Sequence, residues 1–162
     1  MAGLTSVVSD PIAGAGFTFG RYEVYGTASG ASFSRGDVVQ FVMDSSGNYS
    51  AFTAPGSPYG TSHAVFGVCL EDITSGARGR VCIVGTVEAY TYASSGTPSV
   101  AVGGAGVPDT NKNIEFLWTS TYNAKVVASI CAAVATMSST RTLRLVHFNG
   151  FSGWGGRSGG AG

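Results

Sequence analysis

Charged residues are scarce in this chain of 162 residues: nine basic and nine acidic side chains, 11% of the sequence, leave a formal net charge of zero. Soluble proteins average roughly 25% charged residues. Without a basic cluster to neutralise phosphates, binding to nucleic acid is not expected. Few charges also protect poorly against self-association. Two interpretations stay open: a partner covers much of the surface, or Ser, Thr and Asn side chains keep the protein in solution.

Long apolar runs are also lacking. No uninterrupted stretch approaches the ~18–20 residues that cross a bilayer, so we expect no membrane contact. The first residues, MAGLTSVVS, have neither a basic region nor a long apolar one, so they do not predict a secretory signal. Hydrophobic residues still make up 44% of the chain, which excludes charge-driven disorder over its main body.

Cysteine is rare, and no C-x-x-C pair occurs. An odd number of cysteines without a signal sequence predicts reduced thiols in a cytosol-like compartment. Each lies in an apolar, strand-like run, where we expect a small buried hydrophobe. Cys69 and Cys82 could face each other across a hairpin. The three are Cys69, Cys82 and Cys131.

Residues for catalysis or metal binding are few and scattered. The only histidines are His63 and His147, too few for the roughly four ligands of a zinc site. The segment 109–113 begins like a calcium loop, but Ile114 stands where that loop needs glycine. Glu71 and Asp72 are adjacent, so a strand would send them to opposite faces. We therefore expect no enzyme, no cofactor and no metal.

Glycine is abundant, with 25 residues, and it punctuates short runs rich in β-branched and aromatic side chains. Two pairs of runs predict hairpins, 37–43 with 49–53 and 64–70 with 80–92. Only 124–137 could instead be a helix, and we favour a strand there. The pattern predicts one all-β domain over 21–149, a small sandwich or barrel of short strands. The expected strands are 21–25, 37–43, 49–53, 64–70, 80–92, 114–118, 125–135 and 142–148.

Both ends differ from this body. Residues 1–20 have little charge and several glycine and proline breakers, which predicts an extended arm. Residues 150–162 form a glycine-rich tail, in which Phe151 and Trp154 are the side chains able to hold a partner.

A faint internal repeat is also present. The run VFGVC at 65–69 resembles VASIC at 127–131. A break and then a hydrophobic strand follow each run, at 80–85 and 142–150. Either the two halves share one plan, or two β-hairpins are alike by chance.

Three motifs carry a resemblance to a known family. They are the G-D-x-V strand at 36–39, the segment GVCLEDITSG at 67–76, and the strand 79–87 that follows. Together with LRLVHFNG at 143–150, they resemble the capsid cement, or head decoration, proteins of tailed phages. The resemblance covers residues 36–92 and, less closely, 125–150.

This resemblance implies a structural protein, made in the host cytoplasm, that binds the outside of the virion shell as a homotrimer. It would bridge neighbouring copies of the major capsid protein. A glycine-rich arm with aromatic anchors suits such binding, since an extended segment can add a strand to a partner's sheet. The expected capsid-contact residues are Phe17, Phe19, Arg21, Tyr22, Phe151 and Trp154.

Two alternatives remain. A β-rich tail or fibre module could bind a host receptor or a glycan through a shallow aromatic site. A small hydrolase is the third possibility, through His63 or His147. The aromatic candidates for the glycan site are Tyr59, Tyr90, Tyr92 and Trp118.

Overall fold

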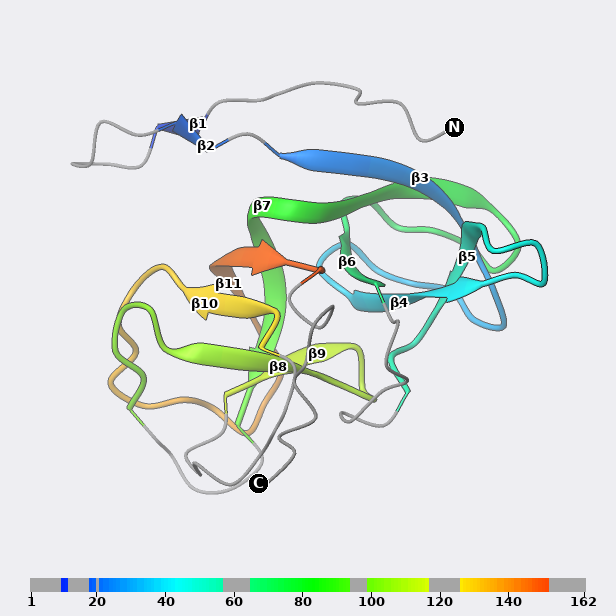
Figure 1. Ribbon diagram of the computed structural model, residues 1–162. Coiled ribbons are helices and arrows are strands. Elements are labelled where there is room, and N and C mark those ends of the chain that lie inside the picture. The colour runs from blue at the N-terminus through cyan, green and yellow to red at the C-terminus, as the bar shows by residue number, and fades with distance from the viewer. Residues whose placement is uncertain are drawn as a thin grey trace, which may run out of the picture.

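The computed structural model describes residues 21–56, 65–93, 99–116 and 126–151, together with the backbone of two short strands before them (Figure 1). Those two strands, β1 (Asp10–Pro11) and β2 (Thr18–Phe19), pair antiparallel in a sheet of their own. The described residues form strands, turns and irregular segments but no helix, so the predicted all-β fold is confirmed. Accordingly, they contain no helix long and apolar enough to cross a membrane.

Nine further strands form one sheet. Their bounds are β3 (Tyr22–Ala28), β4 (Val38–Met43), β5 (Tyr49–Thr53), β6 (Val65–Cys69), β7 (Arg78–Tyr92), β8 (Ala105–Asp109), β9 (Asn113–Glu115), β10 (Ala128–Ile130) and β11 (Thr142–Asn149). Both predicted hairpins are present, since β4 pairs antiparallel with β5 and β6 with β7.

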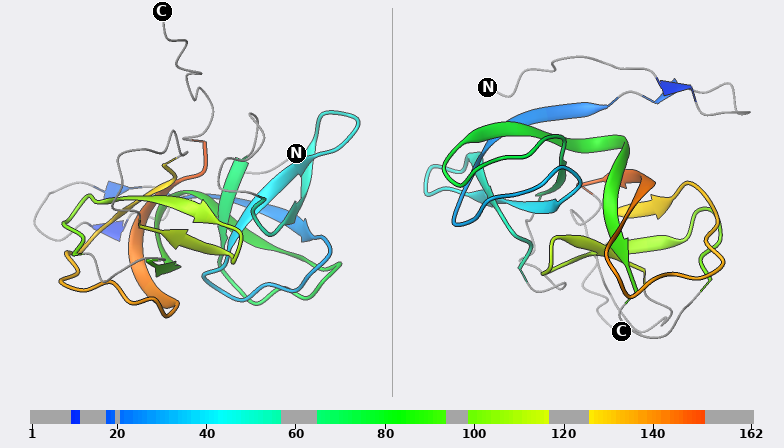
Figure 2. Two further views of the ribbon diagram at one scale, coloured as in Figure 1. Left: turned by 90° about the horizontal axis from the view of Figure 1, so that it is seen from below. Right: turned by 180° about the vertical axis from the view of Figure 1, so that it is seen from behind.

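The sheet closes on itself twice, and β7 belongs to both closures. The first ring runs β7–β3–β5–β4–β6 and back to β7, and the second runs β7–β9–β8–β10–β11 and back to β7. The two rings lie side by side, joined by the long β7 (Figure 2). Each ring has one parallel pair, β3 with β5 and β7 with β9, and its other pairs are antiparallel.

Strand β7 contributes side chains to the cores of both rings. Val81 and Ile83 point into the core of the first ring, whereas Val87 and Ala89 point into the core of the second. Gly85 lies between them with φ 136°, a conformation that favours glycine. A Cβ on Gly85 would also lie 2.6 Å from Arg21 Cγ. Glycine at this position therefore lets the strand change partners without a break.

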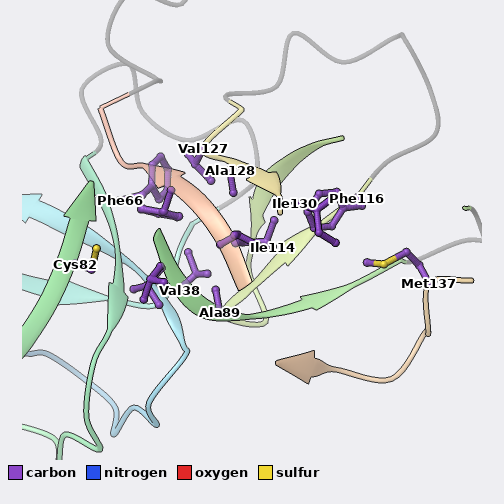
Figure 3. Close-up of a cluster of buried hydrophobic side chains, with 14 of the residues drawn as sticks. Val38, Phe66, Cys82, Ala89, Ile114, Phe116, Val127, Ala128, Ile130 and Met137 are labelled. Carbon is purple, nitrogen blue, oxygen red and sulfur yellow. The ribbon is translucent and has the colours of Figure 1, made fainter. Parts of the chain in front are cut away.

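Each ring encloses its own hydrophobic core. In the first, Phe52 packs edge-on against Phe33 and Phe41, with ring centroids 5.2 and 5.6 Å apart. The second core gathers side chains from both halves of the chain, including Val38, Phe66 and Ile114 (Figure 3). Strand β6 and the start of β4, Val38 and Val39, therefore lie between the cores and are buried on both faces, which explains the continuous apolar run of β6.

The two rings follow one plan. Their strands connect in the same order and sense, so β3 to β7 correspond to β7 to β11. A bridge between Phe33 and Ile73 in the first ring matches one between Val100 and Val134 in the second. After each bridge comes a glycine turn: the Gly36 amide donates to the Cys69 carbonyl at 2.8 Å, and the Gly103 amide to the Ile130 carbonyl at 2.9 Å. The repeat seen in the sequence thus joins equivalent strands, β6 with β10 and β7 with β11.

Three expectations about strands need correction. The first strand does not break at Gly26 but continues to Ala28, because Gly26 lies beneath Phe41 and Phe52, where a Cβ would come within 2.8 Å of both rings. Strand β8 was not expected in a segment rich in glycine and proline. Of the expected strand 125–135, Ala128–Ile130 forms a strand and Val134 only an isolated bridge with Val100, and the other described residues there are irregular rather than helical.

Candidate functional site

The expected contact residues separate into three groups. Phe17 and Trp154 lie outside the described residues, and Phe19 is described only as backbone in β2. Tyr22 and Phe151 come together although they lie at opposite ends of the described chain, with ring centroids 6.5 Å apart. Arg21 lies next to Tyr22 in the sequence but lines a different, polar cleft.

Tyr22 and Phe151 form one wall of an apolar groove of about 190 Å³ at the mouth of the first ring. Its other side chains are almost entirely aliphatic or aromatic. Tyr25 and Phe151 are 48% and 41% exposed, so their rings are open to a partner. The remaining lining residues are Val24, Phe41, Tyr49, Val65 and Ile83.

The groove exists because β3 and β5 separate. They pair at only two positions, Thr27 with Ala51 and Ala28 with Phe52. From Tyr22 to Gly26, β3 pairs with β7 on one side, and the described residues supply no strand on its other side. An unpaired strand edge beside an apolar groove is a template for an extended segment.

Tyr25 and Tyr49 were missed as candidates. The alternation in 21–25 indicated a strand, but it did not reveal which face would stay open. That depends on the parallel pairing of β3 with β5, a contact between segments that no local pattern connects. The one available signal was that both residues are tyrosines within predicted strands.

The polar cleft between the two rings encloses about 310 Å³ and contains Arg21. Its charged side chains, three arginines and two glutamates, pair with one another. Glu23, 5% exposed, lies 3.4 Å from Arg21 Nε and 3.9 Å from Arg80 Nη1. Arg35 Nη2 pairs with Glu88 Oε2 at 2.6 Å across the cleft. Because each arginine lies within 4 Å of a carboxylate and the Arg35–Glu88 pair crosses the cleft, we assign this cleft to holding the rings together.

The first motif of the resemblance, Gly36-Asp37, has a clear structural role. Asp37 is 2% exposed and accepts hydrogen bonds from the Ser34 amide at 2.9 Å and from the Arg141 guanidinium. Lys112 Nζ lies 3.9 Å from the same carboxylate. Since Lys112 and Arg141 come from the second ring, Asp37 links the two rings through a buried ionic cluster.

The remaining motifs are also packing devices. Glu71 accepts a hydrogen bond from the Arg80 amide and Asp72 from the Arg35 amide, so the adjacent carboxylates serve different partners, although they lie after β6 and not in a strand. Gly150 closes the chain onto both rings: its amide donates to the Ile83 carbonyl at 2.7 Å, and its carbonyl accepts from the Phe66 amide at 3.1 Å.

Cys69 and Cys82 do not face each other across the hairpin. Cys69 lies opposite Val81 and Cys82 opposite Val68, which puts the two thiols on opposite faces and in different cores. All three cysteines are free. Burial raises the pKa of the Cys82 thiol to about 12 and also raises the pKa of Cys69 and of half-buried Cys131. The thiols are therefore largely protonated at neutral pH, and the thiolate is the nucleophile.

We expect one fast-reacting thiol in the native protein. Cys131 is the only cysteine with part of its side chain exposed, so Ellman's reagent should label it first. Cys69 and Cys82 should react only when urea unfolds the chain. Cys131→Ser should abolish the fast phase. Rapid labelling of all three thiols without denaturant would show that the cores open easily.

Other polar candidates already have partners. His147 Nδ1 lies 2.9 Å from the Thr86 hydroxyl, and the Arg141 guanidinium stacks 3.7 Å from the centre of the Tyr90 ring. Burial, with nearby Asp109 and Glu115, raises the pKa of Tyr92 to about 12. His63, Tyr59 and Trp118 lie outside the described residues. No three of the described His, Cys, Asp and Glu side chains gather as a metal site would require.

Comparison with known proteins leaves the site to be interpreted from its own geometry. No protein-family model matches the chain, and no curated protein is detectably similar to it.

Proposed function

We propose that this protein is a capsid decoration protein that binds the outside of a phage shell and stabilises the contacts between major capsid subunits. The apolar groove of the first ring is the contact surface. One observation carries this proposal: Tyr22 and Phe151, expected from the sequence to contact a capsid, lie 6.5 Å apart in an apolar groove beside an unpaired strand edge.

The chemistry of the groove suits a protein partner. Interface cores are depleted of charge and enriched in aromatic side chains, which act as anchors. Among the described residues, three tyrosines and two phenylalanines line the groove, and no charged side chain does. Many copies on one shell would strengthen modest individual contacts through avidity.

The position of the groove fits the same role. Tyr22, in the first strand of the large sheet, and Phe151, the last described residue, meet at the groove. In the sequence, the predicted arm 1–20 therefore ends two residues before one groove residue, Tyr22, and the tail continues from another, Phe151. A homotrimer is proposed with this function, because the resemblance implies it.

The glycan-binding alternative draws less support. Of its four aromatic candidates, Tyr59 and Trp118 lie outside the described residues, Tyr90 is stacked under Arg141, and Tyr92 is hydrogen-bonded to Glu115. We therefore keep shell binding as the one proposed function.

Co-sedimentation with expanded phage shells tests the proposal. We expect the wild-type protein to pellet with the shells and to raise their melting temperature, since a ligand that binds only the assembled state stabilises it. Phe151→Ala removes an exposed aromatic anchor and should weaken binding by about tenfold or more.

Val102→Ala is the matched control, because Val102 is the most exposed large hydrophobic residue of the described chain and lies in a turn of the second ring. It should bind like wild type. If the wild-type protein stays in the supernatant at every concentration, shell binding is wrong. If Val102→Ala weakens binding as much as Phe151→Ala, the groove is not the contact surface.

A further inference from the structure

The described residues leave the apolar groove partly open. Its aromatic rings are partly open to solvent, and contiguous exposed apolar surface of this kind usually marks a binding site. One candidate occupant is the C-terminal segment of the same chain. Phe151 forms part of the wall, and the sequence continues from it into SGWGGRSGGAG at 152–162.

Trp154 is the only large apolar side chain in that segment. It follows Phe151 by three residues, and extended chain spans about 3.3 Å per residue, so its backbone can reach roughly 10 Å from Phe151. That reach covers a groove of about 190 Å³, whose wall includes Phe151 itself.

The neighbours of Trp154 also suit a close approach. Gly153 and Gly155 flank it, and without side chains they let the backbone lie close to a surface. A buried indole needs an acceptor for its N–H group. The groove is lined by Tyr22, Tyr25 and Tyr49, and a phenol oxygen can accept that hydrogen bond.

We propose that in the free protein Trp154 inserts its indole ring into the apolar groove formed by Tyr22, Tyr25 and Phe151 of the same chain. The short connection favours this intramolecular contact, because short flexible linkers give effective concentrations in the millimolar range. The contact covers the surface that we propose for shell binding, so a shell would have to displace Trp154. It nevertheless concerns the free protein alone and stands if shell binding fails.

Tryptophan fluorescence of the full chain tests this contact without shells. The protein has two tryptophans, so Trp118→Phe leaves Trp154 as the sole reporter. We expect blue-shifted emission and several-fold weaker acrylamide quenching than for the urea-unfolded chain. Tyr25→Ser and Phe151→Ser each remove an exposed groove wall and should restore strong quenching. Leu145→Ser, at a residue 50% exposed and outside the groove, should not.

Three results would overturn the proposal. Native Trp154 could be quenched as strongly as in urea, which would show an open groove. Quenching could be weak but unchanged by Tyr25→Ser and Phe151→Ser in a chain that circular dichroism shows to be folded, which would place Trp154 elsewhere. Weak quenching that becomes strong on dilution would show that the tail of a second copy fills the groove.

Discussion

Replacing Asp37 by alanine should lower the free energy of unfolding by about 3–5 kcal/mol, the usual cost of removing one partner from a buried ion pair. Its carboxylate is the shared partner of Arg141 and Lys112 and accepts a hydrogen bond from the Ser34 amide. Without it, two cations at the junction of the rings lose their counter-charge. Urea unfolding followed by circular dichroism measures the loss.

Glu88→Ala provides the matched control for Asp37→Ala. Glu88 also pairs with an arginine across the rings, Arg35 at 2.6 Å, but both side chains are about half exposed or more. Exposed pairs of this kind contribute about 0–1 kcal/mol. If Asp37→Ala costs no more than Glu88→Ala, the buried cluster does not hold the rings together.

Gly150→Ala should be the second strongly destabilising substitution, with a cost of about 3 kcal/mol. A Cβ at Gly150 would overlap the Phe66 carbonyl and lie 3.1 Å from the Ile83 carbonyl oxygen. Both are backbone atoms, so relief requires moving a strand. That movement would strain two hydrogen bonds, each worth roughly 1 kcal/mol, in addition to the overpacking.

Gly56→Ala separates this steric effect from the general cost of losing a glycine. A Cβ at Gly56 would meet only Gln40 Oε1, at the ordinary distance of 3.6 Å. We therefore expect a change within about 0.5 kcal/mol. Equal midpoints of thermal unfolding for the two variants would contradict the close approach at Gly150.

Local patterns predicted most of the strands because they depend on short-range chemistry. The hairpin of β4 and β5 follows from two β-rich runs around the turn cluster Asp44–Asn48. There the Asp44 carboxylate accepts hydrogen bonds from the Ser46 and Asn48 amides. The fully apolar run of β6 is explained by burial on both faces, which a sequence cannot distinguish from a helix or a one-sided strand.

The parts that were not predicted depend on contacts between distant segments. Strand β8 contains glycine and proline, residue types that usually end a strand. Its pairing with β9 and β10 maintains it. Likewise, the sequence suggested Tyr22 and Phe151 separately, but their meeting requires the closure of the first ring. The tyrosines at 25 and 49 became candidates only when β3 and β5 were seen to separate.

The shared plan of the two rings also places the groove in context. The rings agree in strand order, bridges and glycine turns, yet their residues have diverged. As far as the described residues show, it is the first ring that gathers tyrosines and phenylalanines in a groove that includes Phe151. We therefore propose that the first ring carries the contact surface, whereas the second supports it through the Asp37 cluster.

Cryo-electron microscopy of expanded phage shells incubated with the protein tests the central claim most directly. The account predicts added density in threefold clusters on the shell exterior, with the first ring innermost and the groove of Tyr22, Tyr25 and Phe151 against a capsid subunit. Shells that carry no added density under saturating protein would contradict shell binding. Density in which the groove faces solvent would contradict the proposed contact surface.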